Sequence, residues 1–302
     1  MTSKRTALIT GCSDGGIGHA LALELHEGGV RVFATARTLS SMEKLKEKGI
    51  EVFKLDVTVH SSVQNVKAEV EKLTGGTLDM LVNNAGVFYE STAIEDNMSK
   101  IKDMYAVNVF GVMEVSQAFL PLVVEASKAH ITSKSPSWNP RVVQMSSLAA
   151  ICPTPFYSAY NSSKAAMLQY GNTLRVELAP LGVKVITVHV GRVNTRIIRD
   201  IDYKGLPEGS LYTPLKDIYE GVAHEVFPKG ALSCQDFAKA TATHLLKKNA
   251  NPFFWYGGSS LMMWFLDAFF PRTIWDSFVR KTFSLNKLGD AFRKDVLAKK
   301  TV

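Results

Sequence analysis

Two kinds of apolar pattern alternate along the whole of this sequence. Short runs rich in Val, Ile and Phe are separated by longer stretches in which apolar residues recur at helical spacing. The runs predict strands at residues 6–10, 31–37, 51–57, 78–84, 141–147 and 184–191. Nearly continuous apolar strands separated by helices are typical of a parallel sheet that is buried on both faces. We therefore predict a single doubly wound α/β domain.

The cysteines and the net charge limit the classes of function. Cys12, Cys152 and Cys234 lack the spacing of a disulfide framework or a metal site, so we expect reduced thiols inside a cell and no metal. The N-terminus lacks the pattern of a secretory signal. The net charge is +7, and the residues from Arg272 onward hold eight Lys/Arg against three Asp. Such a tail suits either a solvated helix or an anionic lipid surface.

A glycine-rich segment, Thr10–Gly18, follows the first predicted strand and leads directly into a helical pattern. Glycines permit a close approach of the backbone to a pyrophosphate, and a helix N-terminus supplies unpaired N–H donors. At the joint between a strand and a helix, this segment predicts a dinucleotide site in a Rossmann-type domain. Cys12 within it is interpreted as a small packing residue, with a redox-sensitive thiol as the alternative.

The ends of the next three predicted strands also carry candidate cofactor residues. Sheets that bind NAD place an acidic residue after the second strand, whereas this sequence has Arg37 there. A guanidinium group pairs with a 2′-phosphate, which favours NADP(H). Asp56 and Val57 end the third strand, and residues 83–86 end the fourth, where ligands of parallel sheets bind. For Asp56, a helix cap is the alternative.

Tyr160 and Lys164 are one helical turn apart in a helix predicted over residues 158–179. An adjacent ammonium group and a positive nicotinamide would lower the pKa of the phenol and stabilise its anion. Ser147 ends the fifth predicted strand and can hydrogen-bond a substrate oxygen on which charge develops. Tyr157 is interpreted as pocket lining, because the residue four positions after it is Asn161.

From about residue 6 to residue 195 the sequence resembles the short-chain dehydrogenase/reductase family. The resemblance rests on the glycine-rich loop, Asn-Asn-Ala-Gly at residues 83–86, Asn108, and Tyr160-x-x-x-Lys164 with Ser147 thirteen residues before the tyrosine. It implies an NADP(H)-dependent interconversion of a carbonyl and an alcohol. It also implies that Asn108 positions a water in a proton relay from Lys164, and that the chain forms homo-oligomers.

The expected catalytic residues are Ser147, Tyr160, Lys164 and Asn108. The expected cofactor-binding residues are Gly11, Ser13, Asp14, Gly16, Ile17, Gly18, Arg37, Asp56, Val57, Asn83, Ala85, Gly86, Tyr160, Lys164, Val193 and Thr195. Two positions depart from the family pattern: the loop has one additional residue between Gly11 and Gly16, and Val190 stands where proline is usual. The first leaves open which of Cys12, Ser13 and Asp14 touches phosphate, and the second affects the contacts expected from Val193 and Thr195.

Within the family, the loop, Arg37 and the aromatic C-terminus are similar to fungal NADPH-dependent 1-acyldihydroxyacetone-phosphate reductases. This resemblance implies reduction of an acylated ketone on the cytosolic face of the endoplasmic reticulum or on lipid droplets. Reductases of fungal secondary metabolism share the scaffold, so a polyketide or another hydrophobic ketone in the cytoplasm is the alternative. Arg192, Arg196 and Arg199 could face an anionic headgroup, or remain solvated or paired with nearby aspartates.

Residues 253–270 are unusually rich in aromatic and aliphatic side chains. Glycines, serines and Asp267 interrupt the run, and Pro271 ends it before it reaches the roughly 20 apolar residues of a spanning helix. Aromatic residues followed by basic ones suit a membrane-surface anchor. The alternative is a seventh strand at residues 253–256 and a helix packed into the core or a dimer interface.

We expect a catalytic domain over residues 1–250, which includes a mobile substrate flap at 192–230, and an extension over residues 251–302. The expected partner is a hydrophobic or acylated ketone, and no nucleic-acid partner is expected. A function of another class would be that of a catalytically silent, NADP-binding protein of lipid surfaces. The presence of Ser147, Tyr160, Lys164 and Asn108 together argues against it.

Overall fold

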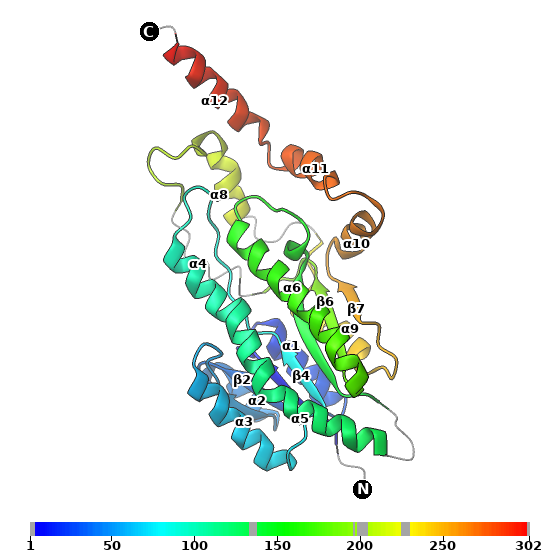
Figure 1. Ribbon diagram of the computed structural model, residues 1–302. Helices are drawn as coiled ribbons and strands as arrows, with labels where there is room; N and C mark the ends of the chain where they lie inside the picture. Colours follow the sequence, from blue (N-terminus) through cyan, green and yellow to red (C-terminus); the bar gives the residue numbers. More distant parts are fainter. Residues whose placement is uncertain (1–3, 133–137, 196, 198–204, 225–229, 301–302) are drawn as a thin grey trace.

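The computed structural model describes residues 4–132, 138–195, 197, 205–224 and 230–300 (Figure 1). In this part of the chain, seven parallel strands form a single sheet with the order β3-β2-β1-β4-β5-β6-β7. The strands are β1 (Thr6–Thr10), β2 (Arg31–Ala36), β3 (Glu51–Lys54), β4 (Met80–Asn83), β5 (Arg141–Ser147), β6 (Lys184–Val190) and β7 (Phe253–Tyr256). The predicted doubly wound, Rossmann-type α/β sheet is confirmed.

Helices connect the strands and cover both faces of the sheet (Figure 1). They are α1 (Ile17–Glu27), α2 (Glu43–Glu47), α3 (His60–Thr74), α4 (Met98–Tyr105), α5 (Val112–Thr132), α6 (Ser158–Leu178), α8 (Lys216–His224), α9 (Cys234–Leu246), α10 (Ser260–Phe269), α11 (Ile274–Thr282) and α12 (Asn286–Lys299). A π-helical turn, Ala106–Gly111, joins α4 to α5.

Alternate residues of each strand contribute to two separate cores. Ala7 and Ile9 of β1 face the layer of α1 and α9, where Leu21 and Phe237 pack. Leu8, between them, faces the layer of α3, α5 and α6. Because side chains of a strand alternate between its two faces, a strand covered on both faces is apolar at most of its positions.

Four predicted strands are longer than the observed ones. β2 ends at Ala36 instead of residue 37, β3 ends at Lys54 instead of residue 57, β4 covers 80–83 instead of 78–84, and β6 ends at Val190 instead of residue 191. At β3, the N–H of Asp56 donates to the Ser62 hydroxyl at 3.0 Å, so it is not available to the sheet. Arg37 and Asp56 therefore lie in the connections just beyond the carboxyl edge of the sheet.

The C-terminal residues both complete the sheet and extend away from it. β7 pairs with β6, so the seventh strand that was one alternative for residues 253–256 is present, and the sheet continues to Tyr256. Helices α10, α11 and α12 then run away from the body of the molecule (Figure 1). On α10, Ser260 and Met263 are buried, whereas Leu261 and Phe269 are exposed.

One helix of the described residues, continuous over Met98–Thr132, is long and apolar enough to cross a membrane. More than half of its most apolar stretch is buried inside the protein, where Phe119 and Leu122 pack in the core. This helix is therefore a core helix of the fold. Helix α10 has only ten residues.

A close backbone contact fixes the turn after β6. A Cβ atom on Gly191 would lie 2.6 Å from the carbonyl carbon of Gly257, and Gly191 N–H donates to the Tyr256 carbonyl at 2.7 Å. We expect Gly191→Ala to lower the free energy of unfolding by about 1–3 kcal/mol, because backbone atoms must separate to admit the methyl group. The midpoint of urea unfolding measures this change.

Gly221 of α8 is the matched control, since a Cβ there meets no atom within 4 Å. Gly221→Ala should leave stability unchanged or raise it by about 1 kcal/mol, because alanine is the better helix former. Equal midpoints for Gly191→Ala and the unaltered protein would contradict the proposed tight contact.

Candidate active site

The glycine-rich loop lies directly against the turn that follows β4. Gly11 has a φ of 75°, and a Cβ on it would lie 2.8 Å from the Cα of Ala85. A Cβ on Gly18 would lie 2.4 Å from Nδ2 of Asn84. The loop therefore requires glycine at both positions, and its backbone stays open to a bound group.

Asn84 holds these two loops together. Its Nδ2 donates to the carbonyls of Thr10 at 2.8 Å and Gly11 at 3.0 Å. The Thr10 hydroxyl accepts the N–H groups of Asn84 and Ala85, each at 3.0 Å. The side chain of Asn83, which the sequence marked as a cofactor residue, instead donates to Ser116 in the interior. The motif alone does not tell which of two adjacent asparagines faces the loop.

The side chains of the loop differ in exposure. Ser13 is exposed and accepts a hydrogen bond from Ser41 at 3.2 Å. Asp14 pairs with Lys44 at 2.6 Å, which lowers the pKa of its carboxyl group. Cys12 is buried, and burial raises the pKa of its thiol to about 12. The interpretation of Cys12 as a packing residue is supported, because a thiol with this pKa forms almost no thiolate at neutral pH.

Arg37 and Asp56 lie near each other, in the connections that follow β2 and β3. Arg37 is exposed. Asp56 accepts hydrogen bonds from the hydroxyl and the N–H of Thr58, at 2.7 and 3.0 Å. These bonds and, more weakly, the charge of Arg37 lower the pKa of the Asp56 carboxyl. Asp56 therefore orders the turn before α3 while it remains next to Arg37.

The expected catalytic residues converge at the carboxyl end of β5. Lys164 is 7% exposed, and its Nζ donates to the Met145 carbonyl at 3.3 Å. The same Nζ lies 5.7 Å from the ring centroid of Tyr160. The Ser147 hydroxyl interacts with the phenol of Tyr160 and accepts the N–H of Ala149 at 3.1 Å. The buried Lys164 and the half-buried Ser147 and Tyr160 thus lie together at this edge of the sheet.

Asn108 lies in the π-helical turn, a local structure that often occurs at functional sites. Its Oδ1 accepts the N–H of Val87 at 2.8 Å, and its Nδ2 donates to the Val87 carbonyl and to Ser163. A Cβ on Gly86 would lie 3.4 Å from this Oδ1 and 3.6 Å from Nζ of Lys164. The side chain of Asn108 therefore fixes the β4 turn beside the lysine, and Ser163 is a supporting residue that the sequence did not indicate.

Burial shifts the pKa values of the tyrosine and the lysine in opposite directions. It raises the pKa of Tyr160 to about 12, against a smaller lowering by Ser147, and it lowers the pKa of Lys164 to about 8. The lowered pKa expected for the tyrosine depends on the positive charge of a bound nicotinamide as well as on Lys164, and it stays a prediction for the complex with the cofactor. The cost of burying a phenolate exceeds the stabilisation that its neighbours provide.

Aromatic side chains occur next to Tyr160 and in the connections near it. Phe88 packs edge-on against both Tyr157 and Tyr160, with ring centroids 4.8 and 4.9 Å apart. Phe156 has a positive φ of 70°, and its ring contacts Tyr212 and Tyr219. Strained residues of this kind cluster at functional sites. The interpretation of Tyr157 as pocket lining agrees with this arrangement.

The remaining expected residues are only partly described. Val193 and Thr195 are buried, at 4% and 7% exposed, in the connection after β6. Arg192 is exposed, and its backbone pairs with Gly258. Arg196 and Arg199 lie outside the described residues, as does part of the expected flap. No group of three metal-ligating side chains occurs among the residues that the structure describes.

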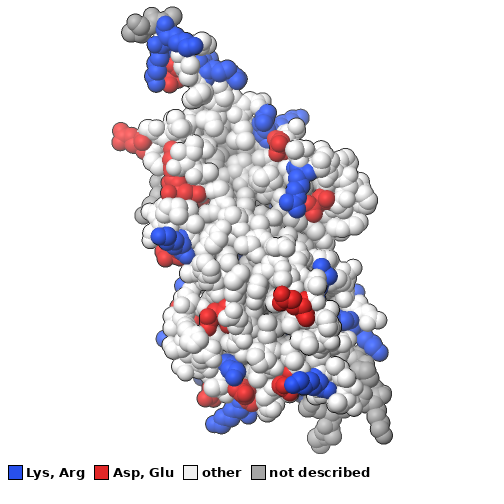
Figure 2. All heavy atoms as spheres, viewed as in Figure 1, with Lys and Arg blue, Asp and Glu red and all other residues white. Residues whose placement is uncertain are grey.

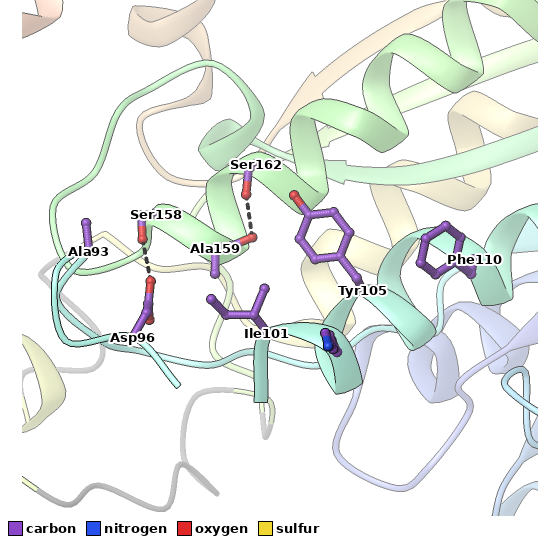
Figure 3. Close-up of a pocket in the computed structure, with 9 residues that line it drawn as sticks. Ala93, Asp96, Ile101, Tyr105, Phe110, Ser158, Ala159 and Ser162 are labelled. Carbon is purple, nitrogen blue, oxygen red and sulfur yellow. Dashed lines mark hydrogen bonds between the residues drawn. The ribbon is translucent and has the colours of Figure 1, made fainter. Parts of the chain in front are cut away.

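A groove of about 510 Å³ lies on the outer side of α4 and α6 (Figure 3). Ser158, Ala159 and Ser162 of α6 line it opposite Ile101 and Tyr105 of α4. Tyr160 and Lys164 are not part of its lining. The groove is therefore separate from the candidate active site.

Comparison with known proteins agrees with the geometry. The family model of short chain dehydrogenases matches residues 5–204. The chain is 39% identical over 300 residues to the short-chain dehydrogenase srdE of Neurospora crassa, covering 99% of this chain and 98% of that protein. It is also 39% identical over 222 residues to the NADPH-dependent 1-acyldihydroxyacetone phosphate reductase of Schizosaccharomyces pombe, covering 72% and 71%.

Among solved structures, a short-chain dehydrogenase from Streptomyces avermitilis superimposes with a TM-score of 0.73 at 25% identity, covering 96% of this chain and 99% of that one. Sequence motifs, sheet topology and the arrangement of the catalytic side chains lead to one conclusion. The chain belongs to the short-chain dehydrogenase/reductase family of oxidoreductases.

Proposed function

We propose that this protein is an NADPH-dependent reductase of an apolar, lipid-like ketone or aldehyde, with Tyr160 as the proton donor. The observation that carries the proposal is the arrangement of the half-buried Tyr160 and Ser147 with the buried Lys164, together with the glycine-rich loop. Aromatic rings around the phenol make the surroundings apolar.

The residues present fit a dinucleotide phosphate. Gly11 and Gly18 leave the backbone of the loop open, and Gly16, which precedes α1, has no side chain to cap the N–H groups of the first turn of the helix. Arg37 supplies a guanidinium for the 2′-phosphate, in agreement with the NADPH dependence in the name of the Schizosaccharomyces relative. NADPH, when bound, supplies the hydride.

Side chains of the protein donate the proton and orient the oxygen that receives it. With a pKa of about 12, Tyr160 is protonated at neutral pH and can donate to the oxygen of the substrate. Ser147 orients that oxygen by a hydrogen bond, and Lys164 holds a positive charge beside the phenol. Asn108 keeps the turn after β4 in place next to the lysine.

The substrate is proposed from the similarity to a named relative and from the chemistry of the side chains around Tyr160. The leading candidate is the ketone of 1-acyldihydroxyacetone phosphate, which is supported by the relative of that name. A hydrophobic ketone without a phosphate is the second candidate, because Phe88 packs its ring against both Tyr160 and Tyr157. Both candidates share the same reduction.

We also propose that the extension contacts a lipid surface while the sheet-bearing part performs catalysis. Most large apolar side chains of α10 and its C-terminal end are exposed: Leu261, Met262, Trp264, Phe265, Phe269 and Phe270. Lys and Arg side chains gather on α12 (Figure 2), where they would face anionic headgroups. Self-association remains a prediction.

Consumption of NADPH by the purified protein tests the proposed function. The protein is assayed with 1-palmitoyl-dihydroxyacetone phosphate and with long-chain ketones that lack phosphate, each with NADPH and with NADH. We expect turnover of at least one of these ketones, with NADPH preferred at least tenfold because Arg37 pairs with the 2′-phosphate.

Turnover of the phosphate ester alone would support the lipid precursor as substrate, and turnover of the uncharged ketones would support the second candidate. Binding of NADPH without oxidation by any carbonyl compound would contradict the proposed function.

The rate of reduction should also depend on pH through Lys164. Its amine is protonated below its pKa of about 8 and neutral above it. Because the proposed chemistry needs the ammonium beside the phenol, kcat should be constant from pH 6 to 7 and fall above pH 8. Initial rates at saturating NADPH and ketone measure the profile, and a rate that stays constant to pH 10 would contradict the role of the lysine.

A further inference from the structure

Glu90 is a buried carboxyl group that the proposed mechanism does not use. It is 7% exposed, and neither of its carboxyl oxygens has a hydrogen-bond partner in the part of the chain that the structure describes. Burial raises its pKa to about 7. A buried carboxyl without a partner lowers stability, so its presence calls for a functional explanation.

Glu90 lies near Tyr157, which the ring of Phe88 connects to Tyr160. It lies two residues after Phe88, whose ring contacts Tyr157 and Tyr160. The next residue, Ser91, donates its N–H to the carbonyl of Phe156 at 2.9 Å and pairs with Tyr157. The charge of Glu90 raises the pKa of Tyr157, which places the carboxyl near this ring.

Two other acidic residues of the same connection show what such a carboxyl accepts. Glu95 accepts the hydroxyl of Thr92 at 2.6 Å, and Asp96 accepts the hydroxyl of Ser158 at 2.9 Å. Glu90 has no hydroxyl partner of this kind among the described residues. Of the three acidic residues, it is the closest in sequence to the turn after β4. A hydroxyl group of a bound molecule would give Glu90 the kind of partner that Glu95 and Asp96 have within the chain.

We propose that Glu90 determines specificity by accepting a hydrogen bond from a hydroxyl group of the substrate, so that the enzyme prefers uncharged hydroxylated ketones. A hydroxyl suits both states of the carboxyl, because it donates to the ionised form and accepts from the protonated form. A phosphate at the same place would be repelled by the ionised form. The inference rests on the proposed carbonyl reduction and specifies the substrate class of the second candidate, the uncharged ketone; it favours that candidate over the phosphate ester, which has no alcohol hydroxyl.

The test compares dodecan-2-one with its derivatives hydroxylated at carbon 1, 3 or 4. The unaltered enzyme should reduce at least one hydroxyketone with a kcat/KM about 10- to 100-fold above that of dodecan-2-one, the range expected for one hydrogen bond to a carboxyl. Glu90→Leu should abolish this preference through KM and leave kcat for dodecan-2-one unchanged. Glu90→Gln, which keeps an acceptor oxygen, should retain part of the preference.

The stability of Glu90→Leu distinguishes a role in substrate specificity from a structural role of the carboxyl group. Because the carboxyl has no partner, Glu90→Leu should leave the midpoint of urea unfolding unchanged or raise it. Glu95→Gln is the matched control: it removes a charge from the same connection and should leave the preference for the hydroxyketone unchanged.

A preference that persists in Glu90→Leu would overturn the proposal, as would equal turnover of all four ketones by the unaltered enzyme; both results leave the reductase activity itself established. Failure of the enzyme to reduce any ketone would overturn the proposed function and this inference together.

Discussion

The hydrogen bonds of Asn84 connect the glycine-rich loop after β1 to the turn after β4. Its amide holds the carbonyls of Thr10 and Gly11, so the loop after β1 and the turn after β4 cannot separate without breaking buried hydrogen bonds. The β4 turn continues into Val87, which Asn108 holds, and Asn108 contacts Ser163 of the catalytic helix. The candidate cofactor loop and the catalytic side chains thus belong to one connected network.

Burial is the second constraint on the site. Exclusion of water raises the pKa of Tyr160 and lowers the pKa of Lys164. Burial therefore favours the uncharged form of both side chains. The same exclusion leaves Glu90 without solvent or partner. A reductase needs a protonated acid beside the carbonyl oxygen, and the raised pKa of Tyr160 keeps its phenol in that form even at alkaline pH.

Much of the fold follows from the sequence, because strands that are buried on both faces are apolar at most of their positions and the order of strands and helices restricts the topology. The spacing of Tyr160 and Lys164 likewise requires both to face the same way on α6. Sequence could not predict that Asn84 rather than Asn83 faces the loop, that burial raises the pKa of the tyrosine, or that Glu90 lacks a partner. Each of these depends on contacts between segments far apart in the chain.

The most direct test of the central claim is a single-turnover measurement of NADPH oxidation by the unaltered enzyme and by Tyr160→Phe with a ketone that the enzyme reduces. The account predicts that the variant binds NADPH with nearly the same affinity, measured by nucleotide fluorescence, while the rate of ketone reduction falls at least 100-fold, because the proton donor is missing. A variant that reduces the ketone at a rate close to that of the unaltered enzyme would contradict the assignment of Tyr160 as the proton donor.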